Sequence, residues 1–272
     1  MKENKMTGFE YLATKSDKYD FNDLCLLAQL LRSEGGCPWD REQTHKSIRK
    51  DIIEETYEVI EAIDNDDPYL MREELGDLLW QVVFHAELER EEGRADMSDI
   101  VHDICAKLVH RHPHVFGSVV ADTSDVVLSN WEKIKTEEKQ RNTVTSKLQS
   151  VPPALPALMR AQKIGKRAAF FDFPDADAVI LKLEEETDEL KNAILGGNQD
   201  EIDEEFGDLL FTAVSLARKL GIDSEESLTR ATEKFIKRFA KLENEAIANG
   251  LDVTKLSMIE LDEIWDRIKH TD

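Results

Sequence analysis

The chain carries the same short acidic pattern twice, at a constant offset of 131 residues. The first copy reads EETYE at 54–58 and ELGD at 74–77. The second reads EETDE at 185–189 and EFGD at 205–208, and each acidic position of the first copy has an acidic counterpart there. Such a repeat predicts two halves that arose by internal duplication and fold alike.

Each copy has the sequence of two antiparallel helices joined by a short turn. The breakers are an Asn-Asp-Asp-Pro run in the first copy and a Gly-Gly-Asn run in the second. Glu189 and Glu205 each lie eight residues from the middle of the second turn, and Glu186 and Asp208 each lie eleven residues from it. At a rise of ~1.5 Å per residue, these separations place all four carboxylates in one layer, roughly 12–17 Å from the turn.

The carboxylates lie at the edge of an apolar helix face. Residues 75–82 and 206–213 each have apolar side chains at i, i+3, i+4 and i+7, the period of an amphipathic helix. Carboxylates that face each other across a helix pair repel unless a cation lies among them, and carboxylate oxygens suit hard divalent cations. The expected metal ligands are Glu55, Glu58, Glu74, Asp77, Glu186, Glu189, Glu205 and Asp208.

Further segments accompany the acidic pattern: GCPWDREQT, EELGDLLWQVVFHAELEREEGR, KLVHRHPHVFG, EEFGDLLF and EKFIKRF. With them the chain resembles the all-α nucleoside triphosphate pyrophosphohydrolases, and within that group the two-domain bacterial MazG family. The resemblance covers nearly the whole chain. It implies an all-α fold of two tandem MazG domains, each similar to a four-helix bundle, and a tight homodimer.

The resemblance also implies a reaction, the hydrolysis of nucleoside triphosphates to the monophosphate and pyrophosphate. We expect Mg²⁺ as the cofactor, with Mn²⁺ as a substitute. The cation would polarise the α-phosphate and activate a water for attack there. Glu185 and Glu54 lie outside the expected ligand set, so that either could orient or deprotonate this water.

Basic pairs repeat as well. Lys107 and Arg111 in the first half, and Lys234 and Arg238 in the second, are spaced i,i+4 and share a helix face. Two cations on one face can hold terminal phosphates, although an ordinary solvated face has the same spacing. The resemblance assigns phosphate contacts to Lys234 and Arg238.

A tryptophan begins a similar segment in each half, WEKIK at Trp131 and WDRIK at Trp265. Such a side chain can stack on a nucleobase, or it can close the end of a helix bundle. The expected nucleotide-binding residues are therefore Lys234, Arg238, Trp265, Lys107, Arg111 and Trp131.

The acidic composition and the cysteines exclude several other classes of function. A net charge of −22 opposes binding to nucleic acid or to anionic membranes. The three cysteines form no CxxC pattern, which argues against a zinc site and for a reducing compartment. The chain has no long apolar run, no N-terminal signal and no GxxxxGK[ST] loop, so we expect a cytoplasmic protein without a P-loop.

The chain is expected to divide into an N-terminal domain at 1–140, a proline-containing linker at 141–156 and a C-terminal domain at 157–272. Residues 1–20 are polar and are expected to lack regular structure. Serines 98, 224 and 257 are the expected N-caps of the helices that follow them. Helices are expected at 21–33, 44–64, 69–92, 98–111, 126–140, 154–168, 176–195, 199–220, 224–249 and 257–269.

Two other functions fit the same residues. One is a narrower specificity, such as the cleavage of dUTP or phosphoribosyl-ATP, and the other is a non-catalytic nucleotide sensor or partner-binding helical scaffold. Both halves carry the full carboxylate set, whereas GCPWD and RHPHVFG occur in the first half alone. Because the second half is the plainer unit, we expect it to carry most of the turnover.

Overall fold

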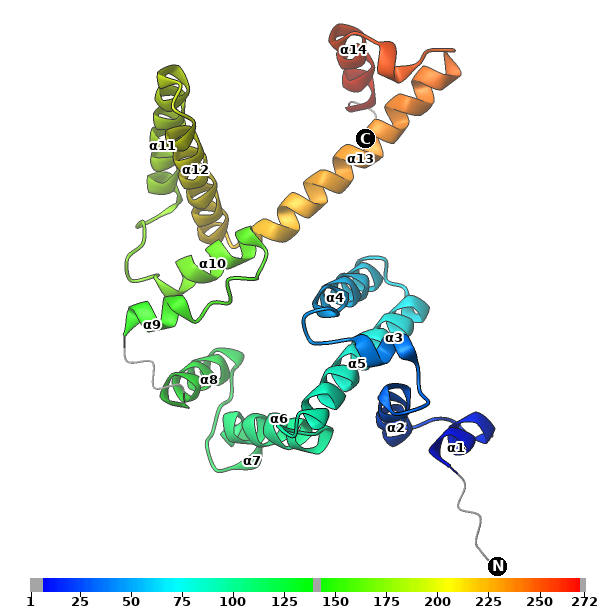
Figure 1. Ribbon diagram of the computed structural model, residues 1–272. Helices are drawn as coiled ribbons and strands as arrows, with labels where there is room; N and C mark the ends of the chain where they lie inside the picture. Colours follow the sequence, from blue (N-terminus) through cyan, green and yellow to red (C-terminus); the bar gives the residue numbers. More distant parts are fainter. Residues whose placement is uncertain (1–6, 139–142, 270–272) are drawn as a thin grey trace, which may run out of the picture. The chain divides into compact units, whose positions relative to one another are not determined.

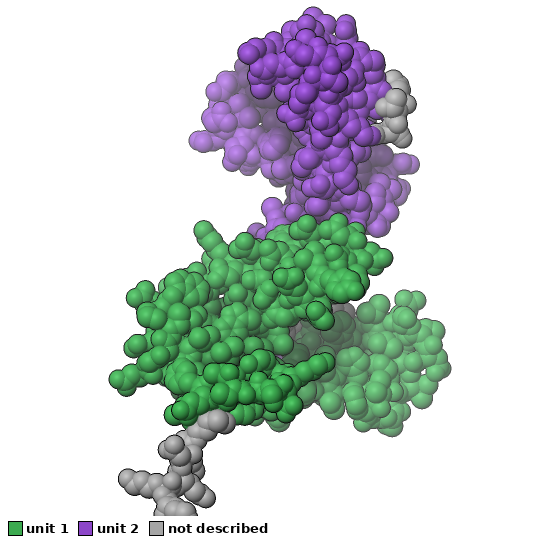
Figure 2. Space-filling model, turned by 90° about the vertical axis from the view of Figure 1, so that its right-hand side faces the viewer, with its two compact units in different colours: residues 1–135 green, residues 136–272 purple. Residues whose placement is uncertain are grey.

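Helices are the only regular elements in residues 7–138 and 143–269, which the computed structural model describes. The chain divides into two units, residues 1–135 and 136–272, shown in green and purple in Figure 2. Among the described helices, none has the length and apolar character that a membrane span requires. The all-α class and the tandem arrangement are thereby confirmed.

The first unit is built around the hairpin of α4 and α5 (Figure 1). Helices α2 and α6 pack against α5, and α1 packs against α2. In chain order the helices are α1 (Gly8–Thr14), α2 (Phe21–Arg32), α3 (Pro38–Glu42), α4 (Arg49–Asp64), α5 (Pro68–Glu91), α6 (Met97–Arg111), α7 (Pro113–Phe116) and α8 (Ser124–Glu138).

The second unit repeats the hairpin and adds a long helix. Its elements are α9 (Val144–Gln149), α10 (Ala157–Arg167), α11 (Ala176–Gly196), α12 (Gln199–Lys219), α13 (Ser224–Ala248), the 3₁₀ turn η1 (Val253–Lys255) and α14 (Met258–Lys269). Helices α11 and α12 form the hairpin, α10 packs against α12, and α14 packs back on α13. Figure 1 shows α13 running away from the hairpin.

Local capping explains where the hairpin helices begin and end. The side chain of Asp67 accepts hydrogen bonds from the backbone N–H groups of Tyr69 and Leu70, and Pro68 takes the first helical position of α5. Helix α11 ends at Gly196, and the C-cap residue Gly197 has a φ of 73°, the left-handed conformation that glycine adopts without strain. Asn198 then caps α12. Both turns therefore lie where the breaker residues predict them.

Two of the expected N-caps differ from the structure. Asp96 caps α6 in place of Ser98, and Asp223 caps α13 in place of Ser224. In each case an aspartate just before the serine accepts the hydrogen bond from a backbone N–H three residues later. The helices accordingly begin slightly earlier than the serines indicate.

The N-terminal segment was expected to lack regular structure, and this is wrong for residues 8–14. Thr7 and Glu10 form a reciprocal capping box at the start of α1. Helix α1 is fastened to α2 because Tyr11 donates a hydrogen bond of 2.9 Å to the carboxylate of Asp23, which also pairs with Lys15. Polar composition alone conceals these specific partners.

The segment expected as a linker, 141–156, is partly a folded portion of the second unit. Residues 139–142 lie outside the described residues, but α9 follows at 144–149 and Val151 is fully buried. The guanidinium of Arg167 donates to the hydroxyl of Ser150 at 2.6 Å and to the carbonyl of Lys147. This proline-containing segment is therefore a packed connection to α10.

The interior of each unit is small. In the first, Trp80 packs on a buried cluster of Ile48, Phe84 and Leu88. In the second, the cluster of Leu242, Ile264 and Ile268 lies between α13 and α14. Large apolar side chains of both hairpins stay exposed in the single chain, including Ile53, Ile63, Leu75, Val82, Leu181, Leu195, Phe206 and Leu210. The described residues of each unit therefore leave these side chains of its own hairpin uncovered.

Candidate functional site

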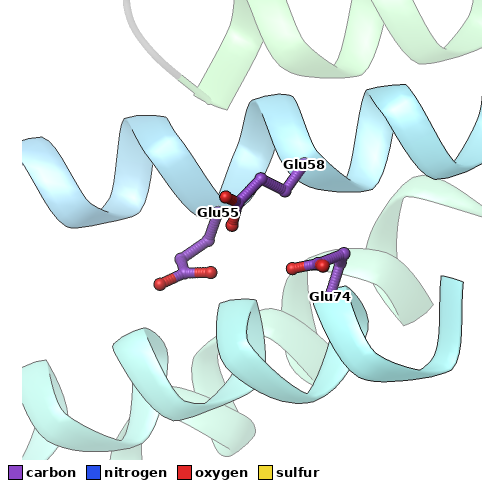
Figure 3. Close-up of side chains that lie close together, drawn as sticks. All are labelled: Glu55, Glu58 and Glu74. Atoms are coloured by element: carbon purple, nitrogen blue, oxygen red, sulfur yellow. The ribbon is translucent and has the colours of Figure 1, made fainter. Parts of the chain in front are cut away.

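Three carboxylates of the first hairpin converge between its two helices. Glu55 and Glu58, one turn apart on α4, reach toward Glu74 on α5 (Figure 3). One oxygen of each lies within 4.8 Å of the others. Glu74 is buried, and the other two are half-buried. Asp77, the fourth expected ligand, is exposed one turn beyond Glu74.

The electrostatics of this set are those of crowded anions. Burial raises the pKa of Glu74, and the charges of Glu58 and Asp77 raise it further. Burial also raises the pKa of Glu55, followed by the charges of Asp77 and Glu58. A hydrogen bond with the buried Gln81 acts in the opposite direction on Glu55. Gln81 is a contributor that the acidic pattern did not reveal.

The second hairpin gathers a related set. Glu186 on α11 and Glu205 and Asp208 on α12 have oxygens within 4.8 Å of one another. Glu186 is buried, whereas Glu189 is exposed beside the set. Burial raises the pKa of Glu205, and the charges of Glu189, Glu186 and Asp208 add to this effect. In the first set, two of the three members lie on the first helix of the hairpin, α4. In the second set, two of the three lie on the second helix of the hairpin, α12.

A lysine contacts one member of the second set, Glu186. Lys182 Nζ is 2.6 Å from Glu185 Oε1, 2.8 Å from Glu186 Oε1 and 4.0 Å from Glu189 Oε2. These hydrogen bonds, with Glu185 first, raise the pKa of the lysine above its usual range. The sequence interpretation missed Lys182, although its spacing of i+3, i+4 and i+7 to the three glutamates places them on one helix face.

The two expected general bases have exposed positions. Glu185 is exposed on α11 and accepts the hydrogen bond from Lys182. Glu54 is exposed on α4 next to the half-buried Glu55. Each is therefore adjacent in sequence to a member of the convergent set and open to solvent.

The expected nucleotide-binding cations lie on other helices. Lys107 and Arg111 are on α6, and Lys234 and Arg238 are on α13, with the lysine exposed and the arginine half-buried in each pair. Helix α13, which carries Lys234 and Arg238, runs away from the α11–α12 hairpin that carries the second carboxylate set (Figure 1).

The two tryptophans have packing contacts. The ring of Trp265 lies 5.3 Å from that of Phe235 and borders the cluster between α13 and α14. The indole nitrogen of Trp131 is buried without a hydrogen-bond partner, and the ammonium of Lys135 lies 5.7 Å from the centre of its ring. Of the two roles considered for Trp265, base stacking and packing of the helix bundle, the single chain shows packing.

A histidine pair in the first unit also escaped the sequence interpretation. The Nδ1 atoms of His45 and His85 are 2.6 Å apart, and the rings are nearly parallel. Burial lowers the pKa of His85, and His45 lowers it further. Nε2 of His85 is buried without a partner, whereas Nε2 of His45 is 2.9 Å from Glu89. Residues 40 positions apart give no local signal of such a pair.

Both hairpins lie in stretches of the chain that match a known family of proteins. The model of the MazG nucleotide pyrophosphohydrolase domain matches the chain twice, at residues 43–116 and 175–242. The chain belongs to the MazG family. Each MazG match contains a complete hairpin with its carboxylates and the basic pair that follows, whereas Trp131 and Trp265 lie outside both matches.

Full-length relatives agree with this assignment. The nucleoside triphosphate pyrophosphohydrolase of Escherichia coli K12 is 46% identical over 252 residues, which cover 90% of this chain and 95% of the relative. The nucleoside triphosphate pyrophosphohydrolase/pyrophosphatase MazG of Thermotoga maritima is 43% identical over 254 residues, which cover 93% and 96%. The expected family and the expected class of enzyme are thus confirmed.

Proposed function

We propose that the protein hydrolyses nucleoside triphosphates to the nucleoside monophosphate and pyrophosphate. The observation that carries the proposal is the convergence of three carboxylates in each hairpin, within both stretches that match the MazG domain. The names of the E. coli and T. maritima relatives support the same activity.

The proposed cofactor is Mg²⁺, with Mn²⁺ as a substitute. The donors are all carboxylate oxygens, the ligands that hard divalent cations prefer. The raised pKa values of Glu74 and Glu205 fit a set that lacks sufficient positive charge. The residues that would hold the cation are Glu55, Glu58, Glu74 and Asp77 in the first half and Glu186, Glu189, Glu205 and Asp208 in the second. When bound, the cation supplies positive charge that polarises the α-phosphate and makes a water more acidic.

Glu185 is the proposed general base of the second half. It is exposed beside Glu186, and its hydrogen bond to Lys182 restricts its carboxylate. It would accept a proton from the water whose oxygen attacks the α-phosphorus. The bond from that phosphorus to the oxygen that bridges to the β-phosphate breaks, and pyrophosphate leaves. Glu54 has the equivalent position in the first half.

Product analysis tests the proposed reaction. Pyrophosphate is the expected first product from common ribo- and deoxyribonucleoside triphosphates, and excess EDTA should abolish its release until Mg²⁺ or Mn²⁺ is restored. Orthophosphate as the first product, or full activity in EDTA, contradicts the proposal. Turnover confined to dUTP or to phosphoribosyl-ATP indicates the narrower specificity, and binding without turnover indicates a nucleotide-sensing scaffold.

We also propose a homodimer in which a second copy covers the exposed hairpin faces. Leu181, Leu195 and Phe206 are 66%, 85% and 50% exposed in the single chain, and large exposed apolar surface can mark a protein interface. The same arrangement would let Lys234 and Arg238 of one copy approach the carboxylates of the other and neutralise the β- and γ-phosphates. The partner copy would then complete the site.

Sedimentation velocity tests the dimer. The wild-type protein should sediment as a dimer at micromolar concentration, and Leu210→Asp, on the exposed face of α12, should shift it toward the monomer. Val120→Asp, outside the hairpins at a position that is 75% exposed against 44% for Leu210, is the control. A monomeric wild-type protein contradicts the proposal.

A further inference from the structure

Equivalent positions next to the two carboxylate sets carry opposite charges. Asp51 lies in the first turn of α4, four residues before Glu55. Lys182, 131 residues later, lies four residues before Glu186 on α11. Residues four apart on a helix are neighbours on its surface. The two halves therefore have the same expected ligand positions but differ by two charge units at this position.

Lys182 is engaged with the second set. Its ammonium contacts Glu186, which is a buried member, at 2.8 Å and Glu185 at 2.6 Å, and it lies 4.0 Å from Glu189. The lysine side chain is only 31% exposed. The ammonium is therefore a counter-ion of the second set.

Among the residues that the structure describes, the first set has no equivalent counter-ion. Throughout residues 7–138 and 143–269, no lysine or arginine forms an ion pair with Glu55, Glu58 or Glu74. Gln81, a neutral donor, is the partner of Glu55. Asp51 occupies the position that corresponds to Lys182, so the residue four positions before Glu55 is acidic, whereas the residue four positions before Glu186 is basic.

We propose that Lys182 acts as a built-in competitor for the divalent cation of the second set, whereas the first set binds the cation without competition. The proposal rests on the metal-binding role given to both sets under the proposed function. A cation that binds Glu186 must displace the ammonium or lie close to it, and two positive charges a few ångströms apart repel. In the absence of nucleotide, the first half therefore fills with cation at the lower concentration.

Mn²⁺ binding to the nucleotide-free, full-length protein tests the proposal, with the free ion measured by electron paramagnetic resonance. Glu58→Gln with Asp77→Asn disables the first set and leaves the second to be measured. On this background, Lys182→Met should lower the Mn²⁺ dissociation constant of the second set by about tenfold, an order of magnitude that one nearby charge can produce. An unchanged or raised constant overturns the proposal.

Two matched variants separate charge from packing. Lys182→Arg keeps the positive charge and should leave the Mn²⁺ constant close to that of its background. Lys191→Met removes a lysine of the same helix that pairs with Asp188 and is 65% exposed, and it should also leave the constant unchanged. A tenfold change in either variant overturns the proposal.

The reciprocal change gives an independent arm that does not depend on the folding of Lys182→Met. On a background of Glu189→Gln with Asp208→Asn, Asp51→Lys should raise the Mn²⁺ dissociation constant of the first set by about tenfold. If wild-type protein releases pyrophosphate and Asp51→Lys leaves this constant unchanged, the counter-ion proposal alone is overturned. If the wild type neither binds Mn²⁺ nor releases pyrophosphate, the proposed function fails as well.

Discussion

The two hairpins of this MazG protein have the same carboxylates in different surroundings. In the first, the neutral Gln81 is beside Glu55, and no lysine or arginine among the described residues pairs with Glu55, Glu58 or Glu74, while in the second Lys182 contacts Glu186. The convergent sets also differ, with two members on α4 in one and two on α12 in the other. An equal inventory of ligands therefore does not make two equal sites, because the charges next to the ligands have diverged.

The ion pairs that fasten the ends of the two hairpins also differ in which partner carries which charge. In the second unit, Asp172 accepts hydrogen bonds from Arg218 at 2.9 and 2.5 Å and pairs with Lys219 at 2.8 Å, so the loop before α11 is fastened to the last turn of α12. In the first unit the positive charge comes from α2, before the hairpin, because Arg32 at the end of α2 pairs with Glu91 at the end of α5 at 2.7 Å. We call each of these contacts a clamp. In the second unit the acidic residue precedes the hairpin and the basic residues end it, whereas in the first unit the basic residue precedes the hairpin and the acidic residue ends it.

Paired knock-outs should give the largest difference between the halves. Glu189→Gln with Asp208→Asn should reduce kcat by at least about 100-fold, because the second set loses two of its acidic ligands. Glu58→Gln with Asp77→Asn should leave most of the turnover, as expected from the plainer second half. Pyrophosphate release at saturating Mg²⁺ is the measurement.

The opposite outcome, activity lost in the first double variant and kept in the second, would reverse the assignment of the halves. Equal halving in both would indicate two independent, equivalent sites. Circular dichroism of each variant would serve as the check that it is folded.

Breaking the clamp of the second unit should cost more stability than breaking that of the first. Asp172 has a side chain only 9% exposed, and Asp172→Asn should lower the free energy of unfolding by about 3 kcal/mol. The side chain of Glu91 is 34% exposed, so Glu91→Gln should cost about 1 kcal/mol. Urea denaturation at pH 7 measures both, with the exposed Asp188→Asn as a control near zero.

The clamp of Asp172 also predicts a dependence on pH. Arg218 first, and then Lys219, hold the pKa of Asp172 well below its usual range. A carboxyl with a depressed folded pKa stabilises the fold above its unfolded pKa of about 3.9, and the contribution is lost as the pH falls further. The difference between wild type and Asp172→Asn should therefore shrink below about pH 4; a constant difference would assign the loss to packing.

Removal of metal should separate the two carboxylate sets by a smaller effect. In EDTA, Glu58→Gln and Glu189→Gln should each unfold at the same or a higher temperature than wild type, because each removes one of several crowded negative charges. The gain should be larger for Glu58→Gln, since Lys182 already offsets part of the repulsion in the second set. A large loss of thermal stability in EDTA would make the glutamate a structural residue.

Mild acid should act on the first half through its histidine pair, and this is the smallest effect. The second half has a single histidine, His270. Because the pKa of His85 is lowered in the fold, the neutral form stabilises the unit above the unfolded pKa of about 6.5, and that contribution is lost as the pH falls. His85→Leu should reduce the loss of thermal midpoint between pH 8 and 5.5, whereas His102→Leu, at an exposed position, should not. Equal pH profiles for the two variants contradict this role.

The helices of both hairpins follow from local rules, as their turns and caps show. The Asp67–Pro68 start of α5 and the Gly197 end of α11 are each set by the conformations that a few neighbouring residues allow. The same reasoning overlooked α1 and misplaced the caps at Ser98 and Ser224. The caps were misplaced because an aspartate near the serine accepts the capping hydrogen bond in its place. Helix α1 was overlooked because its polar segment is held by a contact with another helix, α2.

The sequence by itself determined the helical class, the duplication, the family and the level of the carboxylates, because helix period and rise are properties of the chain over a few turns. The tertiary structure alone decided which three carboxylates of each set converge, that Lys182 contacts Glu186 while Glu55 meets Gln81, and that Trp265 packs on Phe235. Burial, side-chain conformation and the nearest charge depend on neighbours from other helices, and no local period of the sequence encodes them.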